Sequence, residues 1–193
     1  MKGRPMRAQM KTDRLLLRWV TMEDAPRLTE LADNWNVARM LARLPPPYPE
    51  NGAEDWIATH DEARTRGKGS PYAITLDGDL IGIAGVEMMD NVHAPGLNVE
   101  LGYWLGEPYW GKGFATEAAR AAITIGFADM GVGHLTSGHF EENAASGSVL
   151  TKCGFEYSGK STRPCLARGE DMPSLDLVMT RDRWIDGLVK QKA

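Results

Sequence analysis

The chain has 193 residues, of which 42% are hydrophobic and 25% are charged, and its formal net charge is −4. This composition is typical of one soluble globular domain, here residues 1–193, with enough chain to bury a substantial core. The negative charge argues against a nucleic-acid-binding protein, because phosphate contacts need a basic surface, and it mildly favours a cationic or amine-bearing substrate.

Cysteine usage and hydropathy predict a cytoplasmic protein. Cys153 and Cys165 are the two cysteines and form no C-x-x-C pair, which is typical of reduced thiols. The N-terminus "MKGRPMRAQMKTDR" is basic but lacks the apolar run of a signal peptide. Nothing approaches the roughly 18 apolar residues that a membrane-spanning helix needs, so no membrane partner is expected. The sequence does not determine the oligomeric state, and a homodimer stays open.

The first half of the chain alternates strand-like and helix-like segments. "TMED" is a capping-type helix start, and Asp77-Gly78 is a strong hairpin signal. The elements expected here are a strand at 14–20, a helix at about 25–34, a proline-rich loop, a helix from Asn51 to about Arg66, and two strands within 72–89.

The second half begins with a strand at 97–105 that is apolar on both faces and is therefore predicted to be central. The remaining elements expected are a helix at 113–131, a strand at 134–140, a helix at 143–154, strands at 155–163 and 174–180 joined by a loop at 164–173, and a last helical turn or two at 181–191. This order predicts an α/β fold, a mixed sheet with helices on both faces.

The segment "GFEYSGKS", residues 154–161, matches the phosphate-binding pattern G-x-x-x-x-G-K-[ST] without a mismatch. Such a loop binds phosphate only when a strand enters it and a helix leaves it. Here a helix is predicted to enter and to end at Gly154, and Pro164 disfavours a following helix. We therefore expect 154–161 to begin a strand rather than to bind a nucleotide.

A better phosphate site is predicted in "GEPYWGKGFATEA", residues 106–118, which follows a strand and runs into a long helix. Gly111 and Gly113 allow the backbone to approach a ligand, the N–H groups from about 111 to 115 can converge on an anion, and Lys112 adds a positive charge. The metal-binding hydroxyl of a triphosphatase loop is replaced by Gly113, so the pattern indicates phosphate binding without a metal. An ordinary glycine-rich turn before a helix is the alternative.

Two segments resemble the signatures of the GCN5-related N-acetyltransferase (GNAT) family. "WGKGFATEA" is similar to the acetyl-coenzyme A signature [QR]-x-x-G-x-[GA], with Trp110 in place of the usual Gln or Arg. "NAASGSVLTKCGF" resembles the second signature, an N-x-x-[AS] helix that ends in K-x-G-F. "KTDRLLLR" is similar to the openings of the branch that modifies ribosomal-protein N-termini, the RimJ/RimL type. The resemblance covers nearly the whole chain, from Arg14 to Trp184.

The resemblance implies a twisted, mostly antiparallel sheet whose strands 97–105 and 134–140 splay apart, with acetyl-coenzyme A between them. The pyrophosphate would lie on the amides of residues 110–115, and the pantetheine would pair with the strand edge at 102–105. The residues implied to contact the coenzyme are Tyr103, Trp104, Leu105, Trp110, Gly111, Lys112, Gly113, Phe114, Ala115, Asn143 and Ser146. Direct transfer of the acetyl group to an amine follows, and no covalent nucleophile is needed, so Cys153 is interpreted as structural.

Two residues are the candidates for catalysis. Glu100 lies in an otherwise apolar strand, where desolvation would raise its pKa, and in the family a glutamate at this position is the base. The alternative is a carboxylate that a neighbour satisfies or that faces solvent. The family tyrosine expected four residues after Ser146 is Leu150 here, so the usual acid is absent. Ser146 would bind the sulfur or hold a water instead, or it would be a first-turn helix residue that bonds only backbone.

The acceptor is expected to be a peptide N-terminus or a small amine. The four histidines lack metal-ligand spacing, so no metal is predicted. Trp35, Tyr48 and Trp56 flank the proline-rich loop and, with the loop at "LARGEDMP", are the candidates for acceptor contacts. A coenzyme A-binding module without catalysis is the competing function, which Leu150 and Trp110 keep open, and an ATP-dependent enzyme using 154–161 is the remote third.

Overall fold

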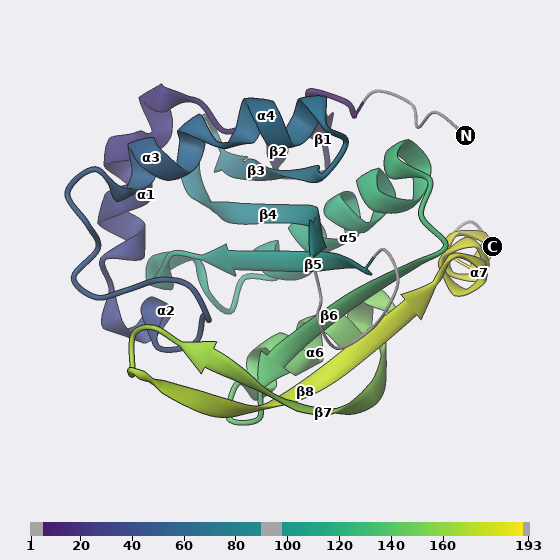
Figure 1. The fold of residues 1–193 in the computed structure, drawn as a ribbon. Helices are drawn as coiled ribbons and strands as arrows, with labels where there is room; N and C mark the ends of the chain where they lie inside the picture. The colour runs from purple at the N-terminus through teal and green to yellow at the C-terminus, as the bar shows by residue number, and fades with distance from the viewer. Residues whose placement is uncertain (1–5, 90–97, 191–193) are drawn as a thin grey trace.

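The computed structural model describes residues 6–89 and 98–190, which form one twisted sheet with helices on both of its faces (Figure 1). The strand order is β1-β2-β3-β4-β5-β6-β8-β7, and every neighbouring pair is antiparallel except β5 and β6. The strands are β1 Gln9–Lys11, β2 Leu16–Trp19, β3 Gly69–Leu76, β4 Asp79–Met89, β5 Asn98–Leu105, β6 His134–Phe140, β7 Glu156–Cys165 and β8 Glu170–Thr180.

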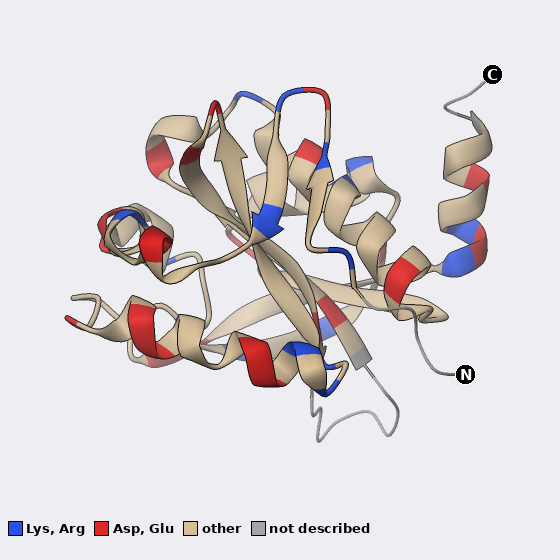
Figure 2. Ribbon diagram, turned by 90° about the horizontal axis from the view of Figure 1, so that it is seen from above, with Lys and Arg blue, Asp and Glu red and all other residues tan. Residues whose placement is uncertain are grey.

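The helices form two layers, which Figure 2 shows on opposite sides of the sheet. They are α1 Ala25–Ala32, α2 Trp35–Ala38, α3 Gly52–Ala58, α4 His60–Thr65, α5 Phe114–Ile125, α6 Ala144–Cys153 and α7 Arg181–Lys190. One apolar core lies between α5, α6 and the sheet, and a second lies between α1, α3 and the other face. We call these the coenzyme side and the acceptor side, after the roles that the resemblance to the GNAT family implies for them. The predicted mixed sheet covered on both faces is confirmed.

Side-chain alternation along β5, and along β4 on each side of a bulge at Ile81, explains why two cores form. Ile81, Leu101 and Leu105 are buried on the coenzyme side, while Ile83 and Leu80 belong to the core on the acceptor side. Strands buried on both faces read as continuous apolar runs, and this is why the central position of β5 was predictable. The structure confirms that position, between β4 and β6.

Several predicted boundaries are wrong. The expected helix 51–66 is divided at Thr59, whose hydroxyl donates to the carbonyl of Trp56 at 2.7 Å, and such a local bond competes with helix continuation. The expected loop 164–173 is mostly strand, because Pro164 lies on the edge strand β7, where a missing N–H is tolerated. The short elements β1 and α2 were not predicted, and α7 has ten residues rather than a turn or two.

Candidate active site

β5 and β6 separate after a single paired position. Glu100 pairs with Thr136 in parallel register, and the hydroxyl of Ser137 donates to the carbonyl of Leu101 at 2.9 Å. In the described part of the chain no further register pair joins these two strands, although β5 stays paired with β4 as far as Leu105. The predicted splay is therefore confirmed, and it leaves the β5 edge at residues 102–105 facing the gap (Figure 1).

The turn that follows β5 leads into α5 through two left-handed glycines. Gly111 has φ 74° and Gly113, the N-cap of α5, has φ 81°. The indole N–H of Trp110 donates to the carbonyl of Leu105 at 2.7 Å and so attaches the turn to the end of β5. Because the first N–H groups of a helix lack intrahelical partners, the α5 N-terminus is a site for a negatively charged group.

Arg14 adds a second cation beside this turn, next to the predicted Lys112. Its guanidinium donates to the carbonyl of Lys112 at 3.0 Å and to Glu117 at 2.7 Å, and it lies 4.5 Å from the ring centre of Phe114. Sequence reasoning missed Arg14, since it lies 98 positions before Lys112 in the chain and only the folded structure brings the two together. Its bonds hold the start of α5 in place.

The predicted coenzyme contacts are brought together, and they fit a pyrophosphate and a pantetheine arm. A Cβ built on Gly102 or on Gly111 would meet no atom within 4 Å, so the backbone is open to a ligand at both positions. Phe114 is buried and Ala115 packs against the core, so these two can offer only their N–H groups. The side chain of Trp104 packs into the acceptor-side core, and that residue too would contribute through its backbone.

The second predicted signature forms the first turn of α6, beside the end of β6. The amide oxygen of Asn143 accepts from the backbone N–H of Ser146 at 3.1 Å, which confirms Asn143 as the N-cap. The hydroxyl of Ser146 lies 2.8 Å from the phenol oxygen of Tyr103 on β5. Ser146 therefore bonds a side chain as well as backbone. Leu150, at the position of the absent tyrosine, is fully buried.

On the acceptor side, Glu100 is held by an arginine that sequence reasoning missed. Arg163 of β7 donates to Glu100 at 2.9 Å and to Asp176 of β8 at 3.0 Å. A side chain at Gly138 would collide with this guanidinium, which lies over β6 and so spans the separation between the strands. Glu100 therefore has a cationic partner in Arg163, and its role as a base stays a prediction.

A second carboxylate, Glu87, lies opposite Glu100 in the register of β4 and β5. Burial raises the pKa of Glu87, the nearby charge of Glu100 raises it further, and Arg43 opposes both. Sequence reasoning missed Glu87, although its position in the apolar run "IGIAGVEMM" was a usable signal. The acceptor side therefore presents a pair of carboxylates at the point where β5 and β6 separate.

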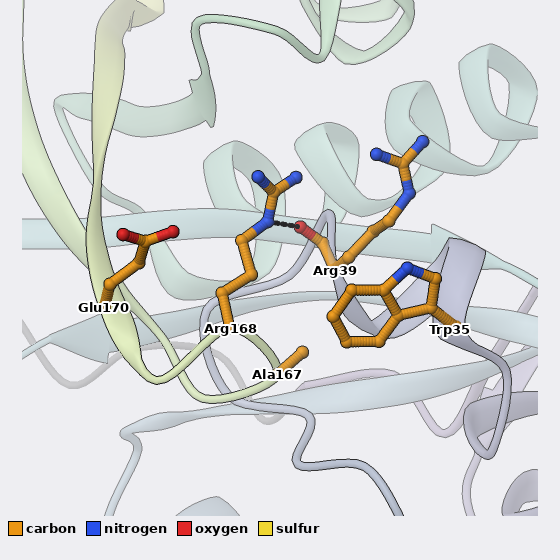
Figure 3. A pocket seen from close by; sticks show the side chains of 5 residues that line it. All are labelled: Trp35, Arg39, Ala167, Arg168 and Glu170. Carbon is orange, nitrogen blue, oxygen red and sulfur yellow. Dashed lines mark hydrogen bonds between the residues drawn. The ribbon is translucent and has the colours of Figure 1, made fainter.

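A pocket of about 370 Å³ lies between α2 and the β7–β8 hairpin (Figure 3). Trp35, Arg39, Ala167, Arg168 and Glu170 line it. The hairpin turn is fixed in place because the N–H of Leu166 donates to the carbonyl of Ala42 at 3.1 Å and Arg168 bonds the carbonyl of Arg39 at 3.2 Å.

Two arginines and two acidic residues meet at this pocket. Arg168 and Arg39 both pair with Glu142, which directly precedes Asn143, and Glu170 belongs to the lining. Of the three predicted acceptor contacts, Trp35 lines the pocket with its side chain exposed, whereas Trp56 packs against His60. Tyr48 packs against the acceptor-side core.

The acetyltransferase (GNAT) domain family matches residues 14–156, which is most of the chain. The chain belongs to the GNAT acetyltransferase family. It is 29% identical over 150 residues to an uncharacterized N-acetyltransferase, p20, of Bacillus licheniformis, covering 77% of this chain and 82% of that protein. It is 27% identical over 189 residues to the [ribosomal protein uS5]-alanine N-acetyltransferase of Escherichia coli, covering 94% and 95%.

Solved structures agree on the fold. Mycobacterium smegmatis RimJ in complex with CoA-disulfide superposes with a TM-score of 0.75 at 21% identity, over 90% of this chain and 88% of that one. The GNAT fold predicted from the two signatures is therefore confirmed, and the protein is an N-acetyltransferase that uses acetyl-coenzyme A.

The structure also shows why residues 154–161 match a phosphate-binding pattern without having the backbone arrangement of such a loop. α6 ends at Gly154, whose φ is 102°, and the chain then enters β7 at Glu156. The expectation of a strand is confirmed, because a helix enters and a strand leaves, the reverse of a phosphate-binding loop. In the described residues no cluster of three or more His, Cys, Asp or Glu suits a metal, and no helix there has the length and apolarity to cross a bilayer.

Proposed function

We propose that this acetyltransferase modifies the N-terminal amine of a protein or peptide, with Glu100 as the base and Ser146 at the leaving sulfur. The observation that carries the proposal is the carboxylate pair Glu87 and Glu100 at the strand separation, on the face opposite α5 and α6. An acceptor amine arrives as an ammonium ion, which needs negative charge to attract it and a base to deprotonate it. The relative that acts on ribosomal protein uS5 supports a protein acceptor.

The coenzyme would be held by the opposite face. The N–H groups at the start of α5, with Lys112 and Arg14, suit the pyrophosphate, and the open β5 edge at 102–105 suits the pantetheine. Asn143 and Ser146 would lie at the thioester end. Holding both substrates across the gap supplies much of the catalysis, since positioning replaces a bimolecular encounter. The single domain 1–193 and the cytoplasmic location stay predictions.

Thiol release with a panel of acceptors tests the proposal. Peptides with a free N-terminus, the same peptides with a blocked N-terminus, and small primary amines are each offered with acetyl-coenzyme A. We expect turnover only with free peptide N-termini, and mass spectrometry should place the added acetyl group on the α-amine. Turnover confined to small amines would overturn the peptide assignment. Tight coenzyme binding without any turnover would favour a non-catalytic binding module. That module is the second candidate because Leu150 stands where the family tyrosine is expected.

A further inference from the structure

A pair of hydroxyl groups connects β5 to α6 on the coenzyme side. The phenol oxygen of Tyr103 lies 2.8 Å from the hydroxyl oxygen of Ser146 and 3.0 Å from the carbonyl oxygen of the same residue. Ser146 is in the first turn of α6, where the backbone is fixed by the Asn143 cap. The ring of Tyr103 packs against the core on the coenzyme side. Each of the two residues is therefore held in position by contacts other than the hydrogen bond between them.

The two hydroxyl groups can share their protons in two ways. A phenol has one proton, so Tyr103 donates either to the carbonyl of Ser146 or to its hydroxyl oxygen. In the first case the Ser146 proton is directed back to the phenol oxygen. In the second case Tyr103 occupies a lone pair of the Ser146 oxygen, and the Ser146 proton is free to point at a third atom.

Tyr103 is suited to be the donor. Burial raises the pKa of its phenol, and this outweighs the opposing hydrogen bond from Ser146. A phenol with a raised pKa keeps its proton throughout the working range of pH. Tyr103 is therefore a permanent donor, and it does not pass its proton on, because that would leave a buried phenolate.

The reaction requires a donor at this place. Transfer of an acetyl group from a thioester breaks the C–S bond and leaves the electron pair on sulfur, and hydrogen bonds to that charge stabilise the transition state. A leucine, Leu150, stands where the family resemblance places a tyrosine for this task, and it is fully buried. The structure offers a phenol beside Ser146 at the first turn of α6, but it comes from β5.

We propose that Tyr103 is a positioning residue that directs the hydroxyl proton of Ser146 at the leaving sulfur of acetyl-coenzyme A. This inference rests on the proposed function, in which Ser146 lies at the thioester. The acceptor ammonium ion loses one proton to the carboxylates of the acceptor side, the freed electron pair of its nitrogen forms the new N–C bond, and the nitrogen then loses a second proton to solvent. The C–S bond breaks, sulfur takes that electron pair, and the thiolate accepts a hydrogen bond from Ser146 until solvent protonates it. Tyr103 and Ser146 keep their protons.

The substitutions Tyr103→Phe and Ser146→Ala, singly and together, test the inference. Tyr103→Phe removes one oxygen and keeps the ring that packs in the core. A hydrogen bond to a charged group contributes about 1.5–3 kcal/mol, so we expect kcat to fall roughly tenfold or more in each variant with KM little changed. Because Tyr103 acts only through the hydroxyl of Ser146, the double variant should be no slower than Ser146→Ala alone.

A second readout separates positioning from a structural role. The thiolate of bound coenzyme A absorbs in the ultraviolet, so a pH titration of the complex reports the pKa of the bound thiol. The hydroxyl pair should lower that pKa in the wild type, and Tyr103→Phe should raise it. The protein thiol Cys153 does not interfere, because burial raises its pKa to about 11, and a titration of the free protein is subtracted as the blank.

Tyr72→Phe is the matched control, since it removes a buried phenol oxygen outside the site, one that donates to the carbonyl of Arg7 at 2.8 Å. It should change neither kcat nor the pKa of the bound thiol, and calorimetry should show coenzyme A binding unchanged in all variants. Additive losses in the double variant, or a bound-thiol pKa unchanged by Tyr103→Phe, would overturn the inference. Absence of turnover in the wild type would overturn the proposed function instead, and the thiol titration would still test the hydroxyl pair.

Discussion

The two faces of the sheet build their halves of the site in different ways. On the coenzyme side, most of the proposed binding groups are backbone N–H groups of one turn, at about 111–115, fixed by two left-handed glycines. On the acceptor side, the groups are side chains from distant segments: Arg43, Glu87, Glu100, Arg163 and Asp176. The difference shows that a short contiguous motif can specify a phosphate site, while an acid–base site requires the whole fold.

The two faces also differ in what a substitution removes. A backbone site is lost only when the backbone changes shape, so its sensitive positions are glycines. A side-chain site is lost one charged group at a time, and each loss changes the ionisation of the others. Substitutions on the acceptor side should therefore change rate and pH dependence, and substitutions on the coenzyme side should change affinity.

The largest effect is expected from the carboxylate pair. Glu100→Gln removes the proposed base, and kcat should fall about 100-fold or more while coenzyme A binding stays close to that of the wild type. Stopped assays across pH measure kcat, and calorimetry measures the affinity for coenzyme A. Turnover equal to that of the wild type would contradict the assignment of Glu100.

Glu87→Gln is the matched variant, and at neutral pH it should lower kcat less than Glu100→Gln does. The raised pKa of Glu87 means that it ionises above the usual range of a glutamate, and its negative charge then adds to the attraction for the acceptor ammonium ion. Wild-type activity should therefore rise with pH across that interval, and Glu87→Gln should remove the rise. A larger loss in Glu87→Gln than in Glu100→Gln would transfer the role of base to Glu87.

The sequence was most informative where neighbours in the chain are also neighbours in space. Asp77-Gly78 predicted the β3–β4 hairpin, and Asn143 and Gly154 predicted both ends of α6. The turn at Gly111 and Gly113 was predicted for the same reason, because glycines, strand and helix follow one another directly. Each of these features depends on local backbone preferences, which one stretch of sequence carries.

The sequence was least informative where pairing of distant strands decides the contact. Arg163 reaches Glu100 across 63 positions and Arg14 reaches Lys112 across 98, and no local pattern reports such distances. Tyr103 was predicted as a coenzyme contact through its strand edge, and the hydrogen bond between its side chain and Ser146 was not predicted. The prolines at 164 and 173 favoured a loop, and the sheet accommodated both within paired strands.

An intermediate effect is expected from the backbone of the coenzyme side. Gly113→Ala places a side chain at φ 81°, which costs roughly 1–2 kcal/mol in the left-handed region, and it disturbs the first N–H groups of α5. Calorimetry should show coenzyme A binding weakened about tenfold or more.

Gly78→Ala is the matched control for Gly113→Ala. Its φ is 98°, open space surrounds it, and it lies in the β3–β4 turn, outside the residues that form the site. It should lower the melting temperature comparably and leave coenzyme affinity unchanged. Equal weakening of binding by both variants would mean that strain alone, rather than the local turn, sets the affinity.

The smallest effect concerns the stability of the acceptor-side layer. His60 on α4 is buried against Trp56, with 4.3 Å between the ring centres, and neither ring nitrogen has a hydrogen-bond partner within the described chain. Burial lowers the pKa of His60 to about 4, with the charge of Arg64 acting in the same direction. Between pH 6.5 and about 4, His60 is therefore protonated in the unfolded chain and neutral in the folded protein. The free energy of unfolding falls as the pH falls through this range.

At about pH 5.5 the loss from His60 should be about 1 kcal/mol relative to neutral pH. His60→Phe keeps a ring against Trp56 and removes the titrating group, so urea unfolding of that variant should be less sensitive to pH between 5 and 7. His134→Gln, at an exposed histidine on β6, is the control and should keep the wild-type dependence. An unchanged dependence in His60→Phe would show that other groups destabilise the protein in acid.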